Sequence, residues 1–104
     1  MTLADADPDA HGSTTVVRLQ GDVDVVTAGD IGDRLCDLVR SGHEVVVVVC
    51  DAVSFVDSRG LAMMARVQRF ADDAGCRLSW RDLPLPVLRT IHLSGLDTYL
   101  RIEA

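Results

Sequence analysis

The sequence predicts an α/β domain: a mixed sheet of four or five strands with helices packed on one face. Five consecutive valines, Val45 to Val49, are apolar and β-branched without alternation, which is typical of a central strand covered on both faces. The apolar period then changes to that of a helix over residues 59–74. Strands and helices alternate along the chain, and this order favours an antiparallel hairpin followed by right-handed parallel crossovers.

The chain is predicted to begin with the hairpin. Thr2 to Ala4 is expected to be a short edge strand, and residues 5–12 a turn-rich linker. Residues 14–20 are predicted to form the second strand, which Gly21 ends.

A short acidic loop, Asp22 to Asp24, should connect this strand to the first helix, predicted over residues 28–41. Thr27 is expected to be the N-cap of that helix. Asp30, three residues later, completes a weak capping box.

The strand over residues 45–50 should be interior, and the helix after it begins near Asp57 and Ser58. On a helical wheel Ser58 falls on the polar half, whereas Asp57 turns the other way and is placed to cap the first turn. Capping is the commonest reason for such residues at a helix start. However, a polar loop between a strand and a helix is also where open α/β folds place functional groups, so Ser58 is the candidate functional residue.

Three arginines, Arg59, Arg66 and Arg69, share the polar half of this helix with Ser58. They are either part of a binding surface or a solvated face that is partly neutralised by Asp73, four residues after Arg69.

The remaining elements are a strand over residues 77–80, a helix over 86–94 and a last strand over 96–102. Pro86 suits the first helical position, and Gly95 ends that helix.

Composition narrows the range of functions. A chain of 104 residues forms one domain, residues 1–104. Its net charge of −6 argues against direct nucleic-acid binding. Residues 1–11 have no apolar core, and the longest apolar run, 45–50, is too short to cross a bilayer. We therefore expect a cytoplasmic protein without membrane insertion.

The cysteines and histidines are too scattered to predict a metal site or a disulfide framework. They are Cys36, Cys50 and Cys76, and His11, His43 and His92. We expect the cysteines to be small core residues, and we expect no cofactor.

Three segments spread over nearly the whole chain resemble the motifs of one family. They are Gly21-Asp22-Val23-Asp24 with Thr27-Ala28; Val47 to Asp51 with Phe55-Val56-Asp57-Ser58-Arg59-Gly60-Leu61; and Ser94-Gly95-Leu96. The family is the STAS domain, in particular the bacterial anti-sigma factor antagonists. The resemblance departs from the family at Arg59, where Ser or Thr is usual, and at the C-terminus, where many relatives carry a final helix.

The resemblance implies a switch based on phosphorylation. Ser58 would be phosphorylated by a cognate anti-sigma factor, a serine kinase of the histidine-kinase-like ATPase fold. The unphosphorylated antagonist would bind that anti-sigma factor and so release a sigma factor. A metal-dependent phosphatase of the PP2C type would reset the switch.

The partner-binding surface is predicted at the end of the sheet where both motif loops open their helices. Acidic and basic side chains there would offer a partner both signs of charge. The predicted contact residues are Asp22, Asp24, Thr27, Asp57, Ser58, Arg59, Ala62 and Arg66.

Two other functions are alternatives to this switch. A serine after a strand resembles the nucleophile elbow of a hydrolase, but the Gly-x-Ser-x-Gly pattern is absent and no histidine has the context of a base. The chain is therefore not expected to be an enzyme. The other alternative is a non-switching STAS module, either a peripheral subunit of a lipid-transport ATP-binding-cassette system or a scaffold in a signalling assembly.

Overall fold

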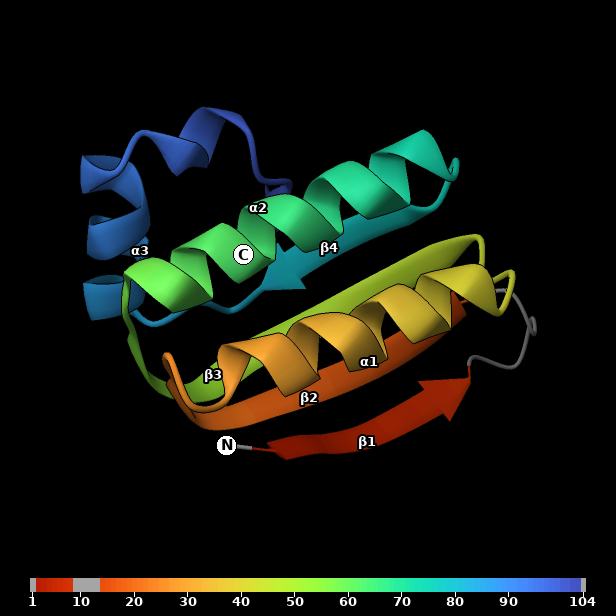
Figure 1. Cartoon of the computed structure of the whole chain (residues 1–104), viewed down its shortest axis with the longest axis horizontal. Helices are drawn as coiled ribbons and strands as arrows, with labels where there is room; N and C mark the ends of the chain where they lie inside the picture. The colour runs from red at the N-terminus through yellow and green to blue at the C-terminus, as the bar shows by residue number, and fades with distance from the viewer. Residues whose placement is uncertain (1, 9–13, 104) are drawn as a thin grey trace.

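The computed structural model describes residues 2–8 and 14–103. Two strands come first along these residues, and helices and strands alternate after them (Figure 1). The elements are β1 (Thr2–Pro8), β2 (Thr14–Val23), α1 (Ala28–Arg40), β3 (Val45–Val56), α2 (Ser58–Asp73), β4 (Arg77–Arg81), α3 (Leu85–Leu93), the 3-10 helix η1 (Leu96–Thr98) and β5 (Ile102–Glu103). The three α-helices begin and end within one residue of the predicted bounds.

The strands form one mixed sheet in the order β1-β2-β3-β4-β5. β1 is antiparallel to β2, and every other neighbouring pair is parallel. This confirms the predicted hairpin, the parallel crossovers and the α/β fold class. β3 is the middle strand, and its residues 46–50 are all buried, as predicted for the run of valines.

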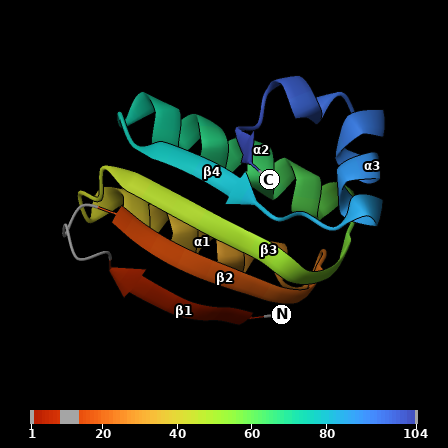
Figure 2. The same ribbon diagram turned by 180° about the vertical axis from the view of Figure 1, so that it is seen from behind.

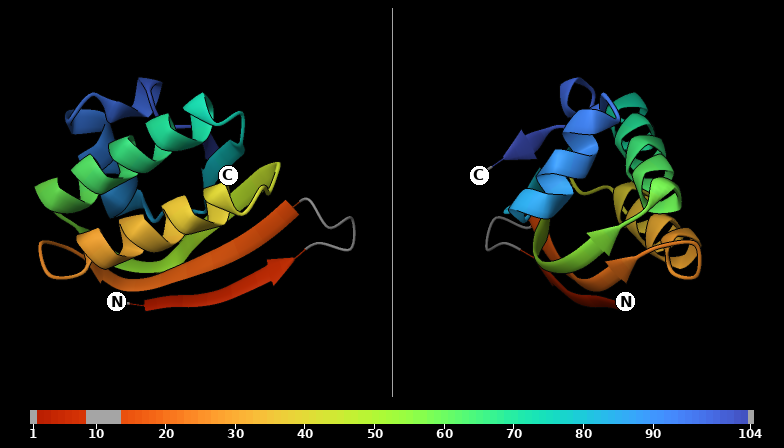
Figure 3. Two further views of the ribbon diagram at one scale, coloured as in Figure 1. Left: turned by 45° about the vertical axis from the view of Figure 1, so that its right-hand side comes forward. Right: turned by 90° about the vertical axis from the view of Figure 1, so that its left-hand side faces the viewer.

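α1 and α2 lie side by side on one face of the sheet (Figure 1). Alternate strand residues point into the core beneath them, among them Val17, Val48 and Trp80, which have no exposed surface. β4 pairs only with residues 45–49 of β3, and α3 packs near the remainder of β3 at the end of the sheet (Figure 3). The two motif loops lie at this same end.

The opposite face of the sheet carries no helix from the described part of the chain (Figure 2). Val47 and Val49 are nevertheless only 6% and 7% exposed. Val49 lies in register between Arg18 of β2 and Arg81 of β4, and the alkyl parts of long charged side chains cover apolar surface while their charges stay in water. The valine run is thus buried on both faces, by helices on one side and by neighbouring side chains on the other.

The N-terminal strands are longer than predicted. β1 includes residues 5–8 of the predicted linker, because its antiparallel pairing with β2 extends to Pro8 opposite Thr15. The rest of that linker, residues 9–12, lies outside the described residues. β2 continues to Val23, so the connection to α1 is shorter than predicted.

The predicted last strand over residues 96–102 is wrong for most of its length. Gly95 has a φ of +81° and ends α3 in the left-handed conformation that glycine adopts without strain. The N–H groups of Tyr99 and Leu100 then both donate to the carbonyl of Leu96, at 2.9 Å. This turn forms η1 and leaves only Ile102–Glu103 to pair with β4.

The three cysteines are buried and free, as expected for small core residues. Burial raises the pKa of the Cys50 thiol to about 12, so this thiol is an inert apolar group at neutral pH. None of the helices among the described residues has both the length and the hydrophobicity needed to span a membrane.

Gln68 of α2 is a buried polar residue that the periodicity did not single out. Its side chain is 1% exposed. Its amide nitrogen donates to the carbonyl of Leu78 at 3.1 Å, and its amide oxygen accepts from Trp80 Nε1 and from the Arg101 N–H, each at 3.0 Å. One side chain therefore joins α2, β4 and the segment before β5.

We predict that Gln68→Leu destabilises the fold by about 2 to 4 kcal/mol, because the buried indole N–H of Trp80 and the partly buried backbone N–H of Arg101 lose their acceptor. Urea unfolding would show this as a lower midpoint with an unchanged slope. Arg69→Leu is the matched control, since Arg69 is exposed and makes only a 3.9 Å ion pair with Asp73. An equal effect of both changes would contradict the role of the Gln68 network.

Candidate functional site

The two motif loops lie beside each other at one end of the sheet. β2 and β3 run parallel, and their last residues, Val23 and Val56, are in register. The chain therefore leaves both strands at the same level before it enters α1 and α2, whose first turns lie at the same end of the molecule (Figure 1). This confirms that the two helix starts share one end of the sheet.

Asp57 joins the two loops. Its Oδ1 accepts a hydrogen bond from the N–H of Gly60 at 2.9 Å, which is the predicted N-cap of α2. Its Oδ2 accepts from the N–H of Val25 at 3.2 Å, and its own N–H donates to the carbonyl of Val23 at 3.2 Å. The link to Val25 depends on the tertiary fold and was not predicted from the sequence.

Asp24 and Thr27 hold the β2–α1 loop in shape. Asp24 Oδ1 accepts from the N–H groups of Val26 and Thr27 at 3.0 and 3.2 Å. The Thr27 hydroxyl lies 3.0 Å from the carbonyl of Asp22 and accepts from the Asp24 N–H at 3.0 Å. Both side chains thus make their hydrogen bonds within the loop.

Thr27 occupies the N-cap position of α1, but the predicted capping box is wrong. The Thr27 side chain makes no capping hydrogen bond, because its backbone is already helical, with φ −105° and ψ −25°, whereas a capping residue usually has extended dihedral angles. Its hydroxyl turns back toward the loop. Asp30 pairs with Arg34 at 3.1 Å instead.

Ser58 is the first residue of α2, and its side chain is exposed, as the helical wheel predicted. No described residue hydrogen-bonds its hydroxyl. The histidines of the described chain are engaged elsewhere, His43 with Thr15 at 2.9 Å and His92 with Asp97 at 2.7 Å. The hydroxyl is therefore open to an external reagent and has no histidine base beside it.

Gly60 lets α2 approach the end of β2 closely. A Cβ at this position would lie 2.5 Å from the carbonyl oxygen of Val23 and 2.8 Å from a methyl group of Val56. In the segment from Asp57 to Gly60, the first and last residues are therefore structural. Ser58 and Arg59, between them, face solvent.

The predicted contact residues fall into two groups. Asp24, Thr27 and Asp57 are half-buried and engaged in the loops. Asp22, Ser58, Arg59 and Ala62 are exposed and lie near the helix starts, and Arg66 is exposed more than two turns into α2. Arg66 reaches across to α1 and pairs with Asp33 at 3.5 Å, and Arg69 pairs with Asp73.

The surface also has an apolar part that was not predicted from the sequence. Val25, Val26 and Phe55 are 63%, 83% and 53% exposed. Val25 and Val26 belong to the loop that Asp57 holds, and Phe55 precedes Ser58 by three residues. The sequence did contain a signal: Phe55 lies in the second motif segment, Val25 and Val26 lie between the two parts of the first, and none of the three belongs to a helical apolar stripe. We call Val25, Val26, Ser58 and Arg59 the Ser58 surface, whereas Phe55 lies on β3 in register with Asp22.

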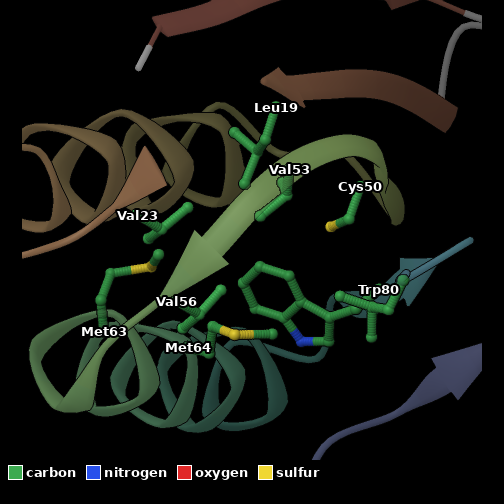
Figure 4. A pocket seen from close by; sticks show the side chains of 9 residues that line it. Leu19, Val23, Cys50, Val53, Val56, Met63, Met64 and Trp80 are labelled. Atoms are coloured by element: carbon green, nitrogen blue, oxygen red, sulfur yellow. The ribbon is translucent and has the colours of Figure 1, made fainter. Parts of the chain in front are cut away.

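The core below the Ser58 surface contains a small apolar void. Its volume is about 10 Å³, it lies between the sheet and α2, and its lining includes Val23, Val56, Met63, Met64 and Trp80 (Figure 4). This volume is at the lower limit for one water molecule, and an apolar void of this size stays dry. The void is therefore part of the apolar core and not a binding site for a polar ligand.

Comparisons with known proteins agree with this description. The family model described as MlaB, STAS domain, matches residues 6–102. The anti-sigma-B factor antagonist of Bacillus subtilis strain 168 is 26% identical over 88 residues, which cover 85% of this chain and 80% of that protein.

Solved structures show the same fold. An anti-sigma factor antagonist from Mycobacterium paratuberculosis superposes with a TM-score of 0.79 at 24% identity, covering 95% of this chain and 84% of its own. The unphosphorylated form of the anti-sigma factor antagonist SpoIIAA gives 0.75 at 20% identity, covering 99% of this chain and 86% of its own. The chain therefore belongs to the STAS domain family and is a homologue of the bacterial anti-sigma factor antagonists.

Proposed function

We propose that this protein is an anti-sigma factor antagonist controlled by phosphorylation of Ser58. Unphosphorylated, it binds a cognate anti-sigma factor kinase and so releases a sigma factor, and a PP2C-type phosphatase restores this form. The protein acts in the cytoplasm, binds no nucleic acid directly and has no catalytic activity of its own. The observation that carries the proposal is the exposed hydroxyl of Ser58 at the start of α2, which no described residue hydrogen-bonds, in a homologue of known antagonists.

The surroundings of Ser58 support a local switch. A phosphoserine adds roughly −1.5 to −2 charges at neutral pH. At an exposed helix N-terminus that charge is favoured by up to about 1 kcal/mol, so the fold itself has no reason to change. The neighbouring carboxylate of Asp57 makes the modified surface strongly negative, while Arg59 offsets part of the charge. Phosphorylation would therefore block an interface sterically and electrostatically.

The fold of a phosphorylated neighbour agrees with this view. SpoIIAA has also been solved in its phosphorylated form, which superposes on this chain with a TM-score of 0.69 over 99% of the chain. At 18% identity this likeness concerns the fold alone. It supports a modification that the fold accommodates without unfolding.

A second candidate is the non-switching STAS module, in a lipid-transport system or a signalling scaffold. Two observations favour it: the matching family model is described as MlaB rather than as an antagonist, and Arg59 follows Ser58 where the antagonists usually have Ser or Thr. Gene neighbours distinguish the two, since a kinase and a sigma factor indicate the switch, and permease genes indicate transport.

The decisive experiment is incubation of the purified protein with ATP and each kinase-fold anti-sigma factor of the same genome, followed by mass spectrometry. We expect one phosphate, on Ser58. Ser58→Ala should bind the kinase constitutively, and Ser58→Asp should bind about 100-fold more weakly, which corresponds to a loss of about 3 kcal/mol. Both should melt close to wild type. Absence of phosphate on Ser58 with every kinase would support the second candidate.

The apolar part of the Ser58 surface gives a separate prediction. Val26→Asp should weaken kinase binding at least tenfold, because a carboxylate replaces an apolar contact at the interface. Leu93→Asp is the matched control, since Leu93, the last residue of α3, is 80% exposed and does not belong to the Ser58 surface. Titration calorimetry would measure both affinities. A larger loss for Leu93→Asp would place the interface on α3 instead.

A further inference from the structure

A groove separates the first turns of α1 and α2, next to the Ser58 surface. Its volume is about 290 Å³. The lining residues are Val25, Ala28, Gly29, Arg59, Ala62, Met63 and Arg66.

Small residues keep this groove open. A Cβ at Gly29 would meet nothing within 4 Å, so the space beside this part of α1 is empty of protein atoms. One turn later the helices close on each other, because a Cβ at Gly32 would collide with the guanidinium of Arg66 and lie 2.9 Å from Met63 Cγ. The groove therefore has a closed end at Gly32 and an open end toward the Ser58 surface.

Both charged residues of the groove are arginines, in a chain whose net charge is −6. Arg66 is held by Asp33 at 3.5 Å. Arg59 makes no ion pair with any described residue, and it lies at the open end, next to Ser58. The groove therefore has an apolar floor. The guanidinium of Arg66 is already paired with α1, whereas that of Arg59 has no carboxylate partner among the described residues.

We propose that this groove receives an aspartate or glutamate of the anti-sigma factor kinase, together with an apolar neighbour of that residue. This inference rests on the proposed function. The volume lies at the lower end of pockets that enclose whole ligands, about 300 Å³, so it suits one or two side chains of a docked segment. A guanidinium can bind a carboxylate through two parallel hydrogen bonds, and the charge of the groove is complementary to an acidic partner residue.

The groove can be filled without disturbing the fold. Gly29→Leu places a side chain in the empty space and replaces a helical glycine by a better helix former, so this variant should melt at or above the wild-type temperature. Arg59→Glu reverses the charge of the open end. Arg69→Glu is the control, because Arg69 lies on the same helix, is exposed and does not line the groove.

The experiment measures affinity for the kinase that phosphorylates Ser58. We expect Gly29→Leu and Arg59→Glu each to weaken binding at least tenfold, and Arg69→Glu by less than threefold. In the kinase, reversing one acidic residue to arginine should restore binding to Arg59→Glu but not to wild type, which is the signature of a direct pair in a double-mutant cycle.

Three outcomes would overturn the inference. If both groove variants bind like wild type while Ser58 is still phosphorylated, the groove is empty in the complex and the proposed function stands. If Arg59→Glu binds weakly but no reversal in the kinase restores it, the occupant is not a carboxylate. If no kinase binds or phosphorylates the wild-type chain, the proposed function fails and this inference fails with it.

Discussion

The carboxylate of Asp57 is the interaction on which this end of the molecule depends. Its two oxygens accept hydrogen bonds from backbone N–H groups of two different segments, Gly60 in α2 and Val25 in the β2–α1 loop. An N-cap alone fixes one helix. Here the same group also fixes the loop that presents Val25 and Val26, so both parts of the Ser58 surface share one structural support.

This support determines how a modification of Ser58 can act. Gly60 allows α2 to contact the carbonyl of Val23 directly, and the N–H of Asp57 donates to the same carbonyl. The start of α2 is thus fixed to the end of β2 by contact and by hydrogen bonds. Charge added to a side chain that points outward from such a frame changes what can dock there more readily than it changes the frame.

Sequence patterns correctly predicted the helices and strands whose burial shows directly in the spacing of apolar residues. Helical periodicity predicted three helices within one residue, and the valine run predicted β3 at the centre, because each pattern reports directly on burial. The prediction of a last strand over residues 96–102 was wrong, because after Gly95 the chain turns and two backbone N–H groups donate hydrogen bonds to the carbonyl of Leu96. Gln68 and the Asp57 link to Val25 could not be predicted, since their partners lie far away in the sequence. At the site, the outward position of Ser58 followed from periodicity, whereas its apolar neighbours required the assembled loops.

The helical glycines are of two kinds. Two of them allow close packing between elements, and the third lies beside open space. A glycine within a helix is unfavourable by about 1 kcal/mol relative to alanine. At Gly60 and Gly32 a Cβ would collide with the neighbouring element, so the close packing of α2 offsets that loss. Gly29 has no such contact, and the space beside it is the groove with Arg59 at its mouth. Packing among the described residues gives no reason for glycine there, whereas a partner side chain that enters the groove would use the space that Gly29 leaves.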